Sequence, residues 1–230
     1  MAIEHVFIDL DNTILDFYSA EEAVLGPALA AHGIAPTAET QALYQRINLE
    51  QWRLLEEGVL SIDEVGVRRF ALLVDALGVA VDPQVLATTY EGMLIEDDHF
   101  IPGAQTLLET LYGRYRLYLV TNGMGSVQYG RIAHAGIGGY FEKLFVSSDL
   151  GAVKPSRAFF DGCFAEIPGF VRERAVILGD GLGSDICGGL NAGIGTIWYN
   201  PRSTTNDSPW QPDVEVHALA EVPDVLAAWR

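Results

Sequence analysis

The sequence has few cysteines and no long apolar run. Its two cysteines, Cys163 and Cys187, are too few and too far apart for a disulfide framework or a Cys-x-x-Cys metal site. We therefore expect two thiols packed in the core or on a helix face. No stretch approaches the ~20 apolar residues that span a bilayer. Glu4 and His5 precede only a short apolar stretch, unlike a secretory signal. We expect a cytoplasmic protein without a membrane partner.

Positive charge is also scarce. The chain has 14 Lys and Arg residues against 31 Asp and Glu residues, and its formal net charge is −17. Such a surface repels phosphate polymers, so we expect no DNA or RNA partner. A small anionic substrate is still compatible with this charge if a metal and a lysine reverse the local field. The histidines show no metal-ligand spacing, and we interpret them as bystanders: His5, His32, His99, His134 and His217.

The first half of the chain has a helical pattern. At 230 residues and 49% hydrophobic content, the chain is long enough for one core and a small accessory domain. Residues 3–9 are predicted to form a strand, and residues 19–98 show no convincing strand. Four helices are expected. The first is capped by Ser19 and ends near Gly33, and the second begins after Thr37 and ends near Gly58. The third begins at the capping box Ser61-Ile62-Asp63-Glu64 and ends near Gly78, and the fourth begins at Asp82-Pro83.

Strands and helices alternate after Pro102-Gly103. This alternation predicts an α/β fold, with a Rossmann-like parallel sheet covered by helices on both faces. We expect residues 1–15 and 99–230 to form this catalytic core and residues 16–98 to form an inserted helical-bundle cap. The expected strands are 115–121, 144–147, 174–179, 195–199 and a short Val214–Val216, and the expected helices are 103–112, 126–135, 156–166, 184–192 and 222–229.

Two carboxylates follow the first strand. The apolar run Val6–Ile8 leads into Asp9, and Asp11 lies two residues further on. A carboxylate is costly to bury unless a cation or hydrogen bonds compensate it. Such a pair suits a metal site, or an acid and a nucleophile that work together. The alternative is an ordinary strand end followed by an Asn-containing turn, and this segment alone does not decide between the two.

Three further polar segments follow apolar runs. They are Thr121-Asn122-Gly123, Lys154-Pro155, and Gly179-Asp180 with the later Asp185. Open parallel sheets bind ligands beyond the carboxyl ends of their strands. A hydroxyl and exposed N–H groups at a strand-to-helix turn can bind phosphate, although a cap with a tight turn would explain Thr-Asn-Gly taken alone. A lone lysine is usually a solvent-exposed residue.

The pattern Asp-x-Asp-x-Thr at residues 9–13, followed in order by the other three segments, resembles the haloacid dehalogenase-like superfamily. The resemblance covers nearly the whole chain. Three segments look like those of the bacterial pyrimidine 5′-nucleotidases: Thr-Asn-Gly, Val-Lys-Pro-Ser, and Gly-Asp-x-x-x-Ser-Asp-Ile-x-Gly-Gly-x-Asn-Ala-Gly. The resemblance implies a phosphomonoester hydrolase that forms an aspartyl-phosphate. Asp9 would be the nucleophile and Asp11 the general acid and base. Thr121 and Lys154 would bind and neutralise the transferring phosphoryl group.

The resemblance also implies a Mg²⁺ cofactor. The carboxylates of Asp9 and Asp180 and the backbone carbonyl of Asp11 would bind it, because Mg²⁺ prefers such hard oxygen ligands. A turn after Asp9 would bring both carboxylates to the substrate. Asp185 is left open between a metal ligand, a helix-end charge, and a partner for metal-bound water or Lys154.

The expected substrate is a small phosphorylated metabolite, with a pyrimidine nucleoside 5′-monophosphate preferred. Asn122 and Gly123 would bind the phosphate, and Phe17 and Tyr18 could stack on the base. We interpret Tyr44 and Trp52 as cap packing. The cap begins directly after the first motif, so we expect it to act as a lid, with an accessory bundle packed elsewhere as the alternative. We expect a monomer or weak homodimer.

Other functions remain as alternatives to a nucleotidase. A phosphatase of phosphoglycolate or a sugar phosphate would use the same core residues, and a phosphomutase is not excluded. A 2-haloacid dehalogenase needs neither a metal nor an acid at position 11, whereas this sequence has Asp11 as an acid and the carboxylates for a metal site. A non-catalytic interaction domain would have no need of the four intact motifs.

Overall fold

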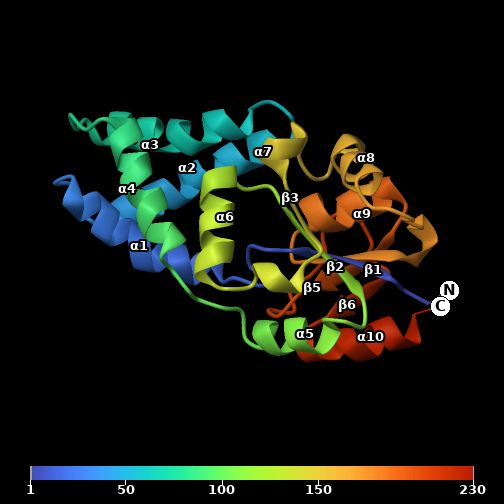
Figure 1. Cartoon of the computed structure of the whole chain (residues 1–230). Coiled ribbons are helices and arrows are strands. Elements are labelled where there is room, and N and C mark those ends of the chain that lie inside the picture. Colours follow the sequence, from blue (N-terminus) through green and yellow to red (C-terminus); the bar gives the residue numbers. More distant parts are fainter. Residues whose placement is uncertain (1, 230) are drawn as a thin grey trace. The chain divides into compact units, whose positions relative to one another are not determined.

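A parallel sheet of six strands forms the centre of the first of two units in this protein (Figure 1). The structure is a computed structural model that describes residues 2–229. Every neighbouring pair is parallel, and the order is β3-β2-β1-β4-β5-β6. This confirms the predicted Rossmann-like sheet. The strands are β1 (His5–Asp9), β2 (Arg116–Thr121), β3 (Lys143–Val146), β4 (Ala175–Gly179), β5 (Gly195–Tyr199) and β6 (Val214–Val216).

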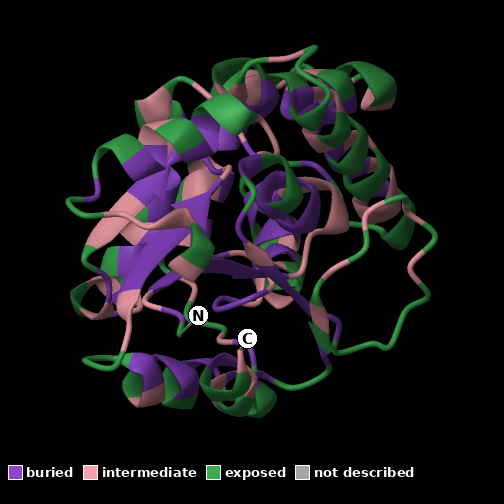
Figure 2. Cartoon of the chain, turned by 90° about the vertical axis from the view of Figure 1, so that its right-hand side faces the viewer, coloured by how far each residue is buried: buried purple, intermediate pink, exposed green. Residues whose placement is uncertain are grey.

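The central strands are apolar because both of their faces are covered. Every residue of β1 and β4 is buried, and the strands are drawn in purple in Figure 2. Buried parallel strands have near-continuous apolar runs for this reason. Helices α5 (Ala104–Leu111) and α10 (Val222–Ala228) cover one face, and α8 (Arg157–Ala165) and α9 (Cys187–Ala192) cover the other (Figure 1). A four-residue helix, α7 (Ser147–Leu150), follows β3 and was not predicted.

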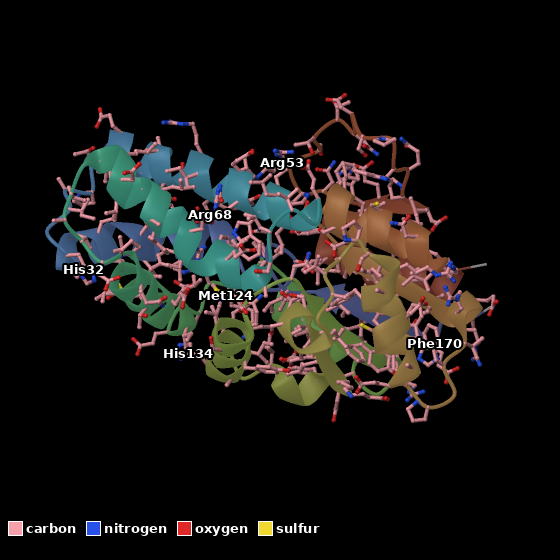
Figure 3. The ribbon with its side chains drawn as sticks, turned by 90° about the horizontal axis from the view of Figure 1, so that it is seen from above. His32, Arg53, Arg68, Met124, His134 and Phe170 are labelled. Atoms are coloured by element: carbon pink, nitrogen blue, oxygen red, sulfur yellow. The ribbon has the colours of Figure 1, made fainter. Side chains whose placement is uncertain are left out.

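Aromatic rings fill the space between the sheet and α8. Phe7 of β1 contacts Phe164 with ring centroids 5.6 Å apart, and Phe164 stacks on Phe170 at 4.1 Å (Figure 3 labels Phe170). Both cysteines are free and buried, as expected from their number and spacing. Within residues 2–229, no helix has the length and apolar character needed to cross a membrane.

The strand order reverses direction between β1 and β4. The chain adds β2 and β3 on one side of β1 and then returns to place β4 on the other side. In open α/β sheets such a reversal opens a crevice at the carboxyl ends of the two strands, where ligands bind. Asp9 ends β1, and Asp180 follows the last residue of β4. The topology therefore places these two carboxylates at the reversal.

The second unit is helical. It consists of Phe17–Asp98 and Gly123–Ala135. Its helices are α1 (Phe17–Ala31), α2 (Ala38–Glu56), α3 (Ile62–Leu77), α4 (Pro83–Ile95) and α6 (Gly125–His134). Its core contains these buried residues: Ala20, Val24, Leu25, Ala28, Leu29, Ile34, Tyr44, Phe70, Leu73, Val74, Leu86, Ala87, Tyr90, Leu94 and Val127.

Three of the four expected helix starts are present. Thr37 accepts a hydrogen bond from the Thr40 N–H, and Ser61 forms a capping box with Glu64. Asp82 caps α4, whose first residue is a proline. The expected cap at Ser19 is wrong, because α1 begins two residues earlier, at Phe17. Ser19 lies inside the first helical turn. The cap was predicted there because Ser19 precedes two acidic residues, Glu21 and Glu22, as an N-cap serine often does.

Helix α6 groups with the helical unit, although the sequence placed the cap at residues 16–98. Gly130 explains the close packing of α6 on α4. A Cβ atom at this position would lie 2.8 Å from Ile95 Cγ2. Met124, labelled in Figure 3, approaches α3 in the same way, since its Sδ would lie 2.7 Å from a Cβ at Gly66. The lid role expected for this unit stays a prediction.

Gly189 allows α9 to pack closely on the sheet. We predict that Gly189→Ala destabilises the first unit. An added Cβ would lie 2.6 Å from both Ile177 Cγ2 and Thr196 Cγ2. Overpacking of this kind costs about 1–3 kcal/mol, and urea unfolding measures it. Gly162→Ala in α8 is the matched control, since its Cβ meets only Leu150 Cδ2 at 3.4 Å. The control should gain about 0.5–1 kcal/mol of helix stability, and equal effects of the two changes would contradict the packing argument.

Candidate active site

The Lys154 ammonium lies between two buried carboxylates. Its Nζ is 2.6 Å from Asp9 Oδ1 and 2.7 Å from Asp185 Oδ1, and it donates a third hydrogen bond of 3.0 Å to the Val120 carbonyl. A lysine ammonium has three N–H donors, so all three have partners. The three charged residues are buried. Lys154 is thus in direct contact with Asp9 and Asp185, which lie 145 and 31 positions away in the sequence.

A tight turn follows Asp9. The Ile14 and Leu15 N–H groups both donate to the Leu10 carbonyl, at 2.9 Å each, and Asn12 has a φ of 62°. Asn adopts this left-handed conformation more readily than most residues. The chain therefore leaves the extended conformation at Asn12, directly after Asp11, where the resemblance implies a turn. Asp11 lies on this turn and is partly exposed.

Thr13 joins the turn to the end of β4. Its hydroxyl donates to Asp9 Oδ2 at 3.2 Å and accepts the Asp180 N–H at 3.2 Å. One side chain therefore orients the Asp9 carboxylate and also holds the loop that carries Asp180.

The loop after β4 is built around the Asp185 carboxylate. A Cβ at Gly179 would lie 2.3 Å from Asp185 Cγ, so only a glycine leaves room for this side chain. The Gly181 N–H donates to Asp185 Oδ2 at 3.0 Å. A π-helical turn, η3 (Leu182–Ile186), carries Asp185 and continues into α9. The expected helix 184–192 is therefore present, but its first turn is wider than an α-helical one.

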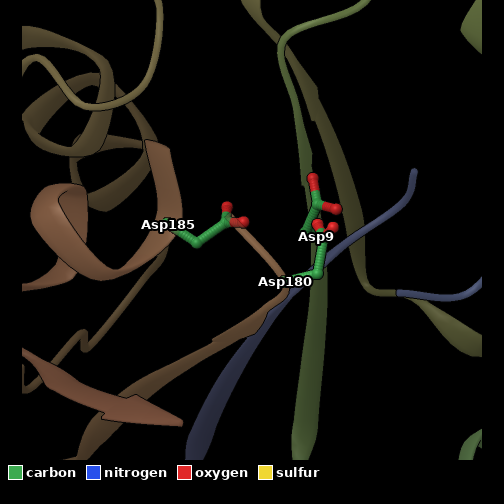
Figure 4. A group of neighbouring side chains, drawn as sticks. All are labelled: Asp9, Asp180 and Asp185. Carbon is green, nitrogen blue, oxygen red and sulfur yellow. The ribbon is translucent and has the colours of Figure 1, made fainter. Parts of the chain in front are cut away.

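Asp9, Asp180 and Asp185 form an acidic cluster (Figure 4). One oxygen atom of each lies within 4.8 Å of the others. Three carboxylates with one ammonium leave two negative charges when all are ionised. Such a set of carboxylate oxygens fits a hard divalent cation such as Mg²⁺.

The pKa directions show the same excess of negative charge. Burial raises the pKa of Asp9 to about 7, against the effect of Lys154, and the charges of Asp185 and Asp11 add to it. Burial also raises the pKa of Asp180 well above its usual value, followed by the effects of Asp9 and Asp185. Burial by itself lowers the pKa of Lys154, but the Asp185 and Asp9 carboxylates outweigh it and keep the ammonium charged. A divalent cation would favour the ionised carboxylates against both the burial and the mutual repulsion that raise these pKa values.

The segment after β2 lies beside Lys154. Thr121 is the last residue of β2 and is buried. Asn122 donates from Nδ2 to the Lys154 carbonyl at 2.8 Å and accepts the Lys154 N–H at 2.7 Å. The sequence predicted that Asn122 would bind phosphate, but its side chain contacts the protein main chain here.

The remaining predicted substrate residues belong to the helical unit. Phe17 begins α1, and the guanidinium carbon of Arg131 lies 5.7 Å from the centre of its ring. Tyr18 is 55% exposed. Gly123 is packed against the Gln128 side chain, whose Cδ would lie 2.2 Å from an added Cβ.

The two cap aromatics interpreted as packing have protein partners. Tyr44 is buried against the rings of Phe70 and Tyr90. Trp52 donates from its indole N–H to Asn48 Oδ1 at 3.0 Å.

Sequence reasoning missed Trp198 and the Val120 carbonyl. Trp198, near the end of β5, donates its indole N–H to the Asp180 carbonyl at 3.0 Å and so holds the same loop as Thr13. A signal was available, because a buried tryptophan N–H usually needs a hydrogen-bond acceptor and Trp198 lies within an apolar strand. A backbone carbonyl such as that of Val120 leaves no signal in the sequence.

Comparisons with known proteins agree with this geometry. A family model described as haloacid dehalogenase-like hydrolase matches residues 3–193. Pyrimidine 5′-nucleotidase PynA of Streptococcus pneumoniae is 37% identical over 227 residues, which are 98% of this chain and 96% of the relative. The HAD-hydrolase YfnB of Bacillus subtilis, solved bound to magnesium, has a TM-score of 0.91 and 36% identity, with 98% of this chain and 99% of that chain covered. A 2-haloacid dehalogenase of Pseudomonas syringae has a TM-score of 0.70 and 28% identity, with 99% and 100% covered.

We predict that Lys154→Met lowers the free energy of unfolding in the presence of a chelator by about 3–5 kcal/mol. It removes one partner of a buried ion pair and leaves the acidic cluster uncompensated. Lys143→Met is the matched control, since Lys143 pairs with Glu166 at the surface and such pairs are worth at most about 1 kcal/mol. Excess Mg²⁺ should restore part of the loss in Lys154→Met, because binding stabilises the folded state. Similar losses for both lysines would show that the cluster does not depend on Lys154.

Proposed function

The chain belongs to the haloacid dehalogenase-like hydrolases, and on this basis we propose that it is a Mg²⁺-dependent phosphomonoester hydrolase that acts through an aspartyl-phosphate. Family membership confirms the resemblance inferred from the four motifs. The observation that carries the proposal is the buried Asp9 carboxylate at the reversal of strand order, held between Lys154 and Thr13 beside the Asp180 and Asp185 carboxylates.

In the proposed reaction, an Asp9 oxygen forms a bond to phosphorus while the bond from phosphorus to the leaving oxygen breaks. Asp11 donates its proton to that leaving oxygen and becomes a carboxylate. Asp11 then takes a proton from a water molecule, whose oxygen attacks phosphorus. The bond from phosphorus to Asp9 breaks, inorganic phosphate leaves, and both residues return to their starting states. Lys154, held by Asp185, offsets the negative charge near Asp9.

The residues that would hold Mg²⁺ are the carboxylates of Asp9 and Asp180 and, as the resemblance implies, the Asp11 carbonyl. When bound, Mg²⁺ would neutralise charge on the phosphoryl oxygens. For Asp185 we favour a supporting role. Oδ1 accepts from Lys154 and Oδ2 accepts from the Gly181 N–H, so both oxygens already have partners in the protein.

We further propose a pyrimidine nucleoside 5′-monophosphate as the preferred substrate. Two observations support it. PynA, named a pyrimidine 5′-nucleotidase, is similar over nearly the full length of both chains. Phe17 and Tyr18 follow Asp11 by six and seven residues, so the chain carries two aromatic rings close to the reacting carboxylates in sequence. Phosphoglycolate and sugar phosphates are the competing substrates of the same chemistry.

We predict that wild-type protein with Mg²⁺ releases phosphate from p-nitrophenyl phosphate and that Asp9→Asn abolishes the release. The amide of Asn is too weak a nucleophile to form the acyl phosphate. Excess EDTA should abolish wild-type activity, and Asp180→Ala should raise the Mg²⁺ concentration needed. Asp149→Asn is a matched control, because Asp149 is an exposed residue of α7 outside the cluster.

More than a few per cent of wild-type rate in Asp9→Asn would contradict the nucleophile role. Full activity in EDTA would contradict the metal site. Release of halide from a 2-haloacid without metal would favour the reaction named for the Pseudomonas syringae protein.

Pyrimidine nucleoside monophosphates should exceed phosphoglycolate and hexose phosphates in kcat/KM, and Tyr18→Ala should reduce this advantage. Stacking on a base is worth about 1–3 kcal/mol, roughly ten- to hundredfold in kcat/KM. Tyr18 is the cleaner variant because it is exposed, whereas Phe17 packs against the helical core. The activity on p-nitrophenyl phosphate should change less, because that ester lacks a ribose and a base. Equal losses on both substrates would contradict base stacking, and a preference for a sugar phosphate would contradict the nucleotidase assignment alone.

A further inference from the structure

Asn122 makes two hydrogen bonds to a single residue that lies 32 positions away. Its Nδ2 donates to the Lys154 carbonyl at 2.8 Å, and its Oδ1 accepts the Lys154 N–H at 2.7 Å. Both distances are at the short end of the range for amide hydrogen bonds. The side-chain amide thus pairs with the main chain of Lys154 as a neighbouring strand would, and two contacts fix both position and orientation.

The other end of Lys154 is held by the same strand. Its Nζ donates to the Val120 carbonyl at 3.0 Å, two residues before Asn122. The end of β2 therefore holds the Lys154 main chain through a side chain and the Lys154 ammonium through a carbonyl. A lysine side chain has many rotamers, and restricting them costs up to about 2 kcal/mol. Fixing both ends restricts the ammonium to the position between Asp9 and Asp185.

We propose that Asn122 is a positioning residue that acts through Lys154 and does not bind the substrate. The inference rests on the proposed function, in which the Lys154 charge assists transfer to Asp9. Without Asn122 the Lys154 main chain loses both contacts, and the ammonium is then fixed only at its tip. A displacement of about 1 Å in a reacting group can cost a hundredfold in rate, so this contact has a direct effect on turnover.

The test compares Asn122→Ala with a matched control, Asn191→Ala. Asn191 donates from its own Nδ2 to the carbonyl of Pro155, the residue next to Lys154, at 3.1 Å. Both variants remove an Asn contact to the same short segment, but only Asn122→Ala releases Lys154. Asn122→Ala should lower kcat about 10- to 100-fold, by the same factor for p-nitrophenyl phosphate and a nucleotide, with KM changed less than about twofold. Asn191→Ala should keep kcat within about twofold of wild type.

A double-mutant cycle separates the positioning role from direct substrate binding. In a Lys154→Met background, Asn122→Ala should cause no further loss of kcat, because coupled residues are not additive. An added loss as large as in wild type would overturn the proposal. So would a clear rise in KM for both substrates, because direct binding of the phosphate, which the two substrates share, predicts that result.

Amide hydrogen exchange provides a readout that does not depend on activity. The Lys154 N–H should exchange faster in Asn122→Ala than in wild type, because its acceptor is gone. The Thr196 N–H, which donates to Asp213 at 2.9 Å, should keep its rate and so report intact folding of the first unit. Unchanged exchange at Lys154 would overturn the positioning role. If wild type releases no phosphate from any ester, the proposed function fails, and this measurement still decides whether Asn122 holds Lys154.

Discussion

The contact of one buried ammonium with two buried carboxylates is the constraint on which the rest of the site depends. Isolated charges are very costly to bury, and Lys154 lies within 2.7 Å of both Asp9 and Asp185. One lysine cannot neutralise three carboxylates, so the cluster that includes Asp180 has an excess of negative charge when all of its groups are ionised. This excess of negative charge makes this end of the sheet suitable for a divalent cation, and such a cation would in turn offset the charge of a phosphate ester.

Three strand ends have to meet for this contact to form. Strand β1 provides Asp9, β2 provides the Val120 carbonyl and is followed by Asn122, and the loop after β4 provides Asp185. These strands are adjacent in the order β2-β1-β4, so their carboxyl ends lie at one edge of the sheet. The apolar faces of the strands and the helices that cover them provide the stability that offsets the cost of collecting charge there.

Local patterns predicted the fold well because the forces behind them are local. Patterns of apolar residues identified all six strands of the sheet, and capping residues such as Thr37, Ser61 and Asp82 identified three helix starts. The one cap that was predicted wrongly has a physical reason. Ser19 had the composition of a cap but lies inside α1. The grouping of α6 with the helical unit depends on close packing at Gly130 against Ile95, and no periodicity in the sequence contains that contact.

The sequence by itself determined the order of the four motifs and hence the family, and it placed Asp9, Thr121 and Asp180 at strand ends, because strand ends follow from runs of apolar residues. Lys154 does not follow a strand directly, since α7 lies between it and β3. Only the tertiary structure decided which polar atoms meet. It joined Asn122 to the Lys154 main chain, Trp198 to the loop of Asp180, and both oxygens of Asp185 to protein donors. These partners lie up to 32 residues apart in the chain. Hydrogen bonds at such separations are set by how the sheet and its loops pack, so a local pattern names at most a candidate partner, as it did for Asp185 with Lys154, and cannot decide which contact forms.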